Sequence, residues 1–197
     1  MTYDLARAIL GDDFISPEDI MKSREGIVYK DELLAKFCRN VPSKDVLEWC
    51  RDNNYMLVAG PDRPRSLLGI GDLNGDYESY GRKWAAGNWV DTHWITLRKE
   101  PVPQSLSKSF REQRTLLSFG EVVPGIARVA WCVTTYKAVR NIYLLPDVYV
   151  RTASVVFHDK HDRACAGYYD VSSGLNIYRS SVCECDEHIG VAATKRY

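Results

Sequence analysis

The stretch PGIARVAWCVTTYKAVRN, residues 124–141, restricts the fold most, because it predicts a long helix and the chain changes character after it. Pro124 suits the start of a helix, and Asn141 suits its end. The residues that fall on one side of this helix are Ile126, Val129, Ala130, Val133 and Tyr136 or Lys137. Such a stripe predicts a helix that packs against another layer of the protein.

Four strand-like runs follow this helix: DVYVRTASVVF, RACAGYYD, GLNIYRS and IGVAATKRY. The segments between them, HDKHD, VSSG and SVCECDEH, are rich in turn-forming residues. Short strands separated by turns predict an antiparallel β-meander. We therefore expect residues 124–197 to form a helix packed on a C-terminal meander.

The N-terminal third is helical in character. Ser16, Pro17 and Asp19 form the pattern of a capped helix start, and Ser43 occupies the same position before a second helix. A short apolar strand, YMLVAG, then leads into a central β region rich in glycine and aromatic residues. The expected fold class is α+β, in one domain spanning residues 1–197. Its expected parts are 1–54 (helical), 55–123 (mixed) and 124–197.

Charge and hydrophobicity exclude some classes of protein. Lys and Arg total 26, and Asp and Glu also total 26, so the net charge is zero. This balance argues against a dedicated duplex-DNA binder, whose affinity depends on neutralising phosphates. The N-terminus has no secretory pattern, and no apolar run approaches the roughly 18 residues of a membrane span. We expect a cytoplasmic protein without membrane contact, in which Cys38, Cys50 and Cys132 are buried apolar residues.

The C-terminal loops hold a candidate metal site. If the four runs formed a simple up-and-down meander, two of its loops would leave the same end of the sheet, roughly 10 Å apart. Three or four ligands could then reach one zinc ion. The candidate ligands are His158, His161, Cys183, Cys185 and His188. Their spacing matches no diagnostic zinc signature, so two ordinary polar loops and no cofactor are the alternative.

The segment YGRKWAAGNWVDTHWITLRK, followed by SKSFREQR, interleaves tryptophans with cations. Such a pattern is typical of protein interfaces, where Trp and Arg are favoured, and of surfaces that stack single-stranded bases. A small aromatic core beneath solvated basic residues is the structural alternative. The candidate binding residues are Trp84, Trp89, Trp94, Arg98, Lys99, Arg111 and Arg114.

Three stretches carry a resemblance: VPSKDVLEWCRDNNYMLVAGP, LRKEPVPQSLSKSFREQRTLLS and WCVTTYKAVRNIYLLPDVYVRT. They resemble a group of uncharacterised hypothetical proteins from metagenome-derived bacteria of candidate phyla. The resemblance runs along most of the chain and implies a bacterial protein, but no activity, cofactor or partner. In that group the C-terminal segment is often rich in aspartate and tyrosine where this chain has VCECDEH. A metal site there would thus be particular to this sequence.

The chain contains no P-loop, nucleophile elbow, zincin motif or kinase set, and no catalytic residue can be named. These observations favour a non-enzymatic protein that binds a protein partner through the aromatic-basic segment. One alternative is a small metal-dependent hydrolase or nuclease that uses the histidines and cysteines above. Another is a module that binds single-stranded nucleic acid.

Overall fold

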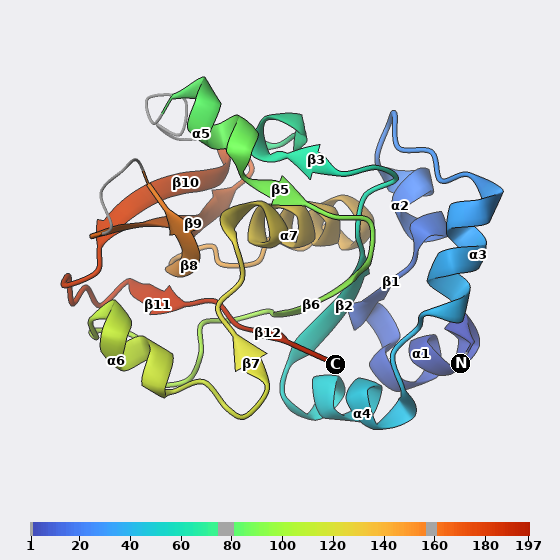
Figure 1. Ribbon diagram of the computed structural model, residues 1–197, viewed down its shortest axis with the longest axis horizontal. Coiled ribbons are helices and arrows are strands. Elements are labelled where there is room, and N and C mark those ends of the chain that lie inside the picture. The colour runs from blue at the N-terminus through green and yellow to red at the C-terminus, as the bar shows by residue number, and fades with distance from the viewer. Residues whose placement is uncertain (1, 75–80, 157–160) are drawn as a thin grey trace.

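The computed structural model describes residues 2–74, 81–156 and 161–197 (Figure 1). The helices, two of them 3₁₀ helices (η), are α1 (Tyr3–Leu10), η1 (Gly11–Asp13), α2 (Pro17–Ser23), α3 (Asp31–Arg39), α4 (Lys44–Asp52), η2 (Leu67–Gly69), α5 (Arg82–Gly87), α6 (Phe110–Thr115) and α7 (Ile126–Arg140). The strands are β1 (Phe14–Ile15), β2 (Tyr55–Ala59), β3 (Arg65–Ser66), β4 (Leu73–Asn74), β5 (Trp89–Val90), β6 (Trp94–Arg98), β7 (Glu121–Val122), β8 (Tyr149–Val155), β9 (Asp162–Asp170), β10 (Gly174–Ser181), β11 (Ile189–Val191) and β12 (Thr194–Lys195). Within these ranges no helix is both long enough and apolar enough to cross a membrane.

The strands form two main sheets, and the α+β class expected from the sequence is confirmed. One sheet has the order β1-β2-β6 and lies beside the N-terminal helices. The other has the order β11-β8-β9-β10-β4 and contains the C-terminal strands. Two further pairs, β12 with β7 and β3 with β5, complete the pairing.

Helix α7 lies in the middle of the molecule and contacts strands of both main sheets (Figure 1). Its predicted apolar stripe is buried, but so are Ala127, Trp131, Cys132 and Thr135 on its other sides. The indole Nε1 of Trp131 donates to the carbonyl oxygen of Ala59 in β2 at 2.9 Å. A helix that is covered on most sides buries more apolar area than a one-sided helix, and this area stabilises the fold.

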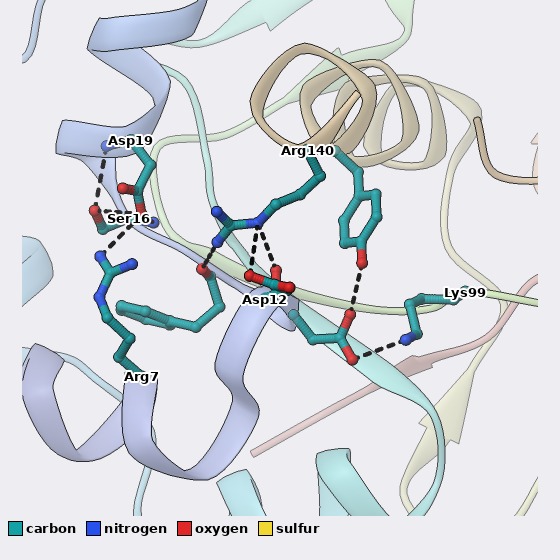
Figure 2. A network of polar contacts seen from close by, with 9 residues as sticks. Arg7, Asp12, Ser16, Asp19, Lys99 and Arg140 are labelled. Carbon is teal, nitrogen blue, oxygen red and sulfur yellow. Dashed lines mark hydrogen bonds and ion pairs between the residues drawn. The ribbon is translucent and has the colours of Figure 1, made fainter. Parts of the chain in front are cut away.

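Polar contacts tie the C-terminal end of α7 to the beginning of the chain (Figure 2). Asn141 ends the helix in the left-handed conformation, with φ of 56°, as its position in the sequence predicts. The Arg140 guanidinium donates to the carbonyl oxygens of Asp12 and Phe14, both at 2.9 Å. Because β1 begins at Phe14, these bonds hold the edge strand of the first sheet against the central helix.

Helices α2 and α4 begin where their predicted caps lie. The Ser16 hydroxyl and the Asp19 carboxylate form a reciprocal capping box around Pro17. The Ser43 hydroxyl accepts a bond from a backbone N–H of α4.

The burial predicted for two cysteines is confirmed, because Cys50 and Cys132 are buried. Cys38 is exposed, so its predicted burial is wrong. Helix α3 buries Phe37 instead, and the next residue along a helix is turned about 100° away from it.

The C-terminal strands β8, β9 and β10 form the antiparallel meander that the sequence predicts. The fourth run differs from a simple up-and-down path. Strand β11 pairs with the far side of β8 and runs parallel to it. A parallel neighbour must begin at the same sheet end as β8, so residues 182–188 have to travel back along the sheet before β11 starts.

Candidate functional site

The path of residues 182–188 determines where the predicted metal ligands Cys183, Cys185 and His188 lie on the sheet. At one end of the sheet, the backbone N–H of Val182 donates to the carbonyl oxygen of His161 at 2.6 Å. At the other end, the N–H of Tyr149, the first residue of β8, donates to the carbonyl oxygen of His188 at 2.8 Å. Cys183 therefore lies near the His161 end of the sheet, whereas His188 lies near the opposite end.

Among residues 2–74, 81–156 and 161–197, no group of three or more His, Cys, Asp or Glu side chains could hold a metal ion. His158 lies outside the described residues. Cys183 and Cys185 are exposed, and Cys183 lines a separate hollow beside Phe110 and Arg111 of α6. The zinc hypothesis thus gains no support from the part of the chain that is described.

His188 instead borders a cavity on the outer face of the second sheet, which we call the tyrosine groove. Its volume is about 420 Å³. Three neighbouring strands each supply a tyrosine: Tyr149 from β8, Tyr168 from β9 and Tyr178 from β10. The Tyr149 ring centroid lies 4.7 Å from that of Tyr168 and 5.4 Å from that of Tyr178. The His188 ring meets Tyr168 edge-on at 6.4 Å, so four rings line the groove.

A β-bulge in β9 brings Tyr168 into this set. Gly174 pairs with Asp170, but Asn176 pairs with Gly167, so β9 contains one residue more than β10 over this interval. Tyr168 adopts φ of 45°, a left-handed conformation that is uncommon for a bulky residue. Strained residues of this kind concentrate at binding and catalytic sites.

Gly167, immediately before Tyr168, is required by the same bulge. A Cβ atom at this position would lie 2.0 Å from the carbonyl oxygen of Val148. Only glycine therefore allows β8 and β9 to approach this closely. Tyr169, the residue after Tyr168, points to the inner face, where it is 1% exposed and contacts the Tyr143 ring.

Carboxylates form the other wall of the tyrosine groove, from Asp170, Glu184 and Asp186. Hydrogen bonds from the hydroxyls and backbone N–H groups of Ser172 and Ser173 lower the pKa of Asp170 to about 2. This carboxylate is therefore ionised at neutral pH. Among the described residues that line the groove, none is a lysine or an arginine.

Each of the other two carboxylates is held by a neighbour. Glu184 accepts a hydrogen bond from the Ser180 hydroxyl at 2.7 Å. Asp186 accepts one from the backbone N–H of His188 at 2.6 Å. These bonds orient both side chains without neutralising them, because neither donor carries a positive charge.

Arg151 anchors the acidic wall from beneath. It is fully buried, and its guanidinium donates to the Ser180 hydroxyl at 2.7 Å and to the carbonyl oxygen of Glu184 at 2.8 Å. It also donates to the carbonyl oxygens of Lys108 and Ser181. Burial lowers the pKa of Arg151, while acidic groups nearby, among them Glu184 and Asp186, oppose that shift. One guanidinium offsets only part of the charge of three carboxylates.

Sequence reasoning named His188 but missed the rest of the groove. The tyrosines lie in strands that were expected only as sheet-forming runs, and a bulge cannot be read from alternation. Arg151 was the available signal, because a cation in the apolar run DVYVRTASVV requires either a partner or an exposed position.

The three tryptophans predicted for a binding surface occupy different environments. Trp94 is 4% exposed, and its indole donates to the carbonyl oxygen of Phe37, so it belongs to the core. Trp84 is half-buried, and its indole donates to the carbonyl oxygen of Val155. Trp89, with 54% of its surface exposed, is the one of the three that remains accessible.

The predicted basic residues also fall into two groups, those with contacts inside the fold and those that are exposed. Arg98 donates to the carbonyl oxygen of Asn53 and lies over the Tyr55 ring. Lys99 forms an ion pair with Asp13 at 2.8 Å (Figure 2). The two exposed basic residues, Arg111 and Arg114, lie on α6. Trp94, Arg98 and Lys99 therefore stabilise the fold, and the predicted aromatic-basic surface is left with fewer accessible members.

Comparison of the chain with protein-family models, with curated proteins and with solved structures gave no match.

Proposed function

We propose that the protein acts by binding a partner protein, and that the tyrosine groove receives a lysine or arginine side chain of that partner. The observation that carries this proposal is the composition of the groove: three tyrosine rings and three carboxylates, with no lysine or arginine among its described lining residues. The sequence also favoured a protein partner. The proposed binding surface differs from the predicted aromatic-basic segment, because the groove is acidic rather than basic.

The chemistry of the groove suits a basic side chain in two ways. Aromatic faces attract cations, by about 0.5–1 kcal/mol at exposed sites and by about 2 kcal/mol when the cation is desolvated. Carboxylates supply charge-assisted hydrogen bonds at defined directions. The contacts among Tyr149, Tyr168 and Tyr178 fix the rings before a ligand arrives, which lowers the entropy cost of binding.

The test uses acetyl-arginine amide as the probe, with acetyl-citrulline amide as an uncharged control of the same shape. We expect the arginine probe, followed by NMR, to shift the resonances of Tyr149, Tyr178 and His188, while citrulline leaves them in place. Tyr178→Ala should weaken binding by about 1 kcal/mol, because it removes one aromatic face. Phe119→Ala is the matched control, since Phe119 is a 99% exposed ring outside the groove.

A second variant separates charge from shape. Glu184→Gln combined with Asp186→Asn keeps the hydrogen-bond acceptors of both side chains and removes two negative charges. We expect this variant to lose most of its preference for arginine over citrulline. Equal binding of the two probes by the wild-type protein would refute the proposal, as would a Tyr178→Ala variant that binds arginine as well as the wild type.

The metal-dependent hydrolase and the single-stranded nucleic-acid module stay predictions from the sequence. Zinc content near one equivalent, in protein purified without a histidine tag, would favour the first of them. Oligonucleotide binding that weakens steeply with salt would favour the second.

A further inference from the structure

A second cavity, of about 480 Å³, shares no lining residue with the tyrosine groove; we call it the cationic pocket. Helix α3, strand β6, the segment 122–125, the first turn of α7 and the residues from Thr194 to Tyr197 line it. Strands β6 and β12 are joined there, because Thr96 bonds to both Thr194 and Lys195. The cavity thus forms where four distant parts of the chain meet.

Basic side chains dominate its rim. Lys36, His93, Arg128, Lys195 and Arg196 line the pocket, and none of its described lining residues is an aspartate or a glutamate. The Asp91 carboxylate lies 3.7 Å from the Arg128 guanidinium and is 58% exposed. An exposed pair at this distance is weak, so it leaves most of the positive potential in place.

Burial and two of these cations lower the pKa of the His93 imidazole. Burial lowers the pKa of His93, and the charge of Arg128 and then of Lys36 lowers it further, although Asp91 opposes them. Two cations from different elements are therefore close enough to act on one imidazole. Arg128 also lies in the first turn of α7, where the helix dipole adds positive potential.

The floor of the pocket is apolar and aromatic. Phe37, Trp94 and Pro124 are buried residues that contribute to its lining. Their positions are fixed, because the Trp94 indole donates to the carbonyl oxygen of Phe37 and the Tyr197 hydroxyl donates to that of Trp94. A pocket with an apolar floor and a few converging charges is typical of a small-molecule site.

We infer that the cationic pocket binds a small organic anion, with a carboxylate or phosphate group held by Lys36, His93 and Arg128 and an apolar body placed on Phe37, Trp94 and Pro124. The lysine and arginine supply charge-assisted bonds to the acid group, and the first turn of α7 favours negative charge at the same place. This inference is independent of the tyrosine groove, whose charge has the opposite sign.

Phenyl phosphate and benzoate are the probes, and benzyl alcohol is the uncharged control. Binding is followed through the imidazole resonances of His93 by NMR, assigned with the His93→Gln variant. We expect both anions to shift these resonances with a saturable curve and benzyl alcohol to leave them unchanged. Arg128→Gln should weaken phenyl phosphate binding about tenfold, as expected for one lost hydrogen bond to a charged group.

Arg51→Gln is the matched control, because Arg51 is a half-exposed arginine that also pairs with a single carboxylate, that of Asp52. It should bind phenyl phosphate as the wild type does. His93 resonances that ignore both anions would overturn the inference. Equal effects of benzyl alcohol and phenyl phosphate would overturn it too, as would wild-type affinity in Arg128→Gln. Loss of arginine-probe binding in the tyrosine groove would leave this result untouched.

Discussion

The tyrosine groove and the cationic pocket differ in how the chain assembles them. The groove draws its lining from residues between Tyr149 and Ile189, on adjacent strands of one sheet and on the segments that connect them. The pocket brings together residues as distant as Lys36 and Tyr197, from two helices and two sheets. Rings on neighbouring strands are held by the backbone ladder, whereas the cations of the pocket extend on long side chains. The groove is therefore a local, rigid site, and the pocket depends on the complete fold.

Among the variants that would separate the groove from the pocket, Arg151→Ala is expected to have the largest effect on stability. The substitution removes a buried guanidinium and leaves several oxygen atoms beneath the groove without their donor. We expect the free energy of unfolding, measured with urea, to fall by about 3–5 kcal/mol, because several buried oxygen atoms lose their donor at about 1–3 kcal/mol for each unsatisfied group. Near room temperature, the arginine probe should lose affinity for the groove, while His93 in the pocket keeps its resonance.

Arg179→Ala provides the control for this variant. Arg179 is 55% exposed on β10 and lies 3.7 Å from Asp162, so its removal should cost less than about 1 kcal/mol. Equal losses of stability in the two variants would show that Arg151 is not the anchor of the acidic wall.

A smaller effect is expected at the bulge. At φ of 45°, alanine has the same steric conflict as tyrosine, whereas glycine has none. Tyr168→Gly should therefore be more stable than Tyr168→Ala by about 1 kcal/mol in thermal or urea unfolding. Both variants should lose affinity for the arginine probe, because both lack the ring. If alanine proved as stable as glycine, the bulge would not hold this residue in a left-handed conformation.

The smallest effect concerns protonation in the cationic pocket. Because the pKa of His93 is lowered in the folded protein, the unfolded chain binds this proton first as the pH falls. His93 therefore reduces stability as the pH drops through the ordinary histidine range, and it has no such effect above that range. NMR titration should give a His93 pKa below about 6.5, the ordinary value.

The response of the His93 pKa to phenyl phosphate tests this prediction further. A bound anion offsets the charges of Lys36 and Arg128, so a saturating concentration should raise the His93 pKa. The arginine probe should leave it unchanged, because that probe belongs to the groove. A His93 pKa that does not respond to phenyl phosphate would count against a shared anion site.

The local features of the chain could be predicted well because they depend on neighbouring residues. The capping box of Ser16 and Asp19 and the end of α7 at Asn141 are set by hydrogen bonds within a few positions. The three antiparallel strands β8, β9 and β10 follow from alternation and short turns. Burial at a single position was less predictable. Helix α3 buries Phe37 and leaves Cys38 exposed, and the spacing of its apolar residues did not show which of the two would be buried.

The sequence by itself determined helices α2, α4 and α7, the caps at Ser16 and Ser43, and the class of the fold, since these arise from propensity and periodicity. Only the tertiary structure decided that β11 pairs with the far side of β8, because strand partners are chosen by long-range packing. That single choice sends SVCECDEH along the sheet, with Cys183 at one end and His188 at the other. A stretch that resembled half of a metal site thereby supplies the acidic wall of a groove lined by tyrosines.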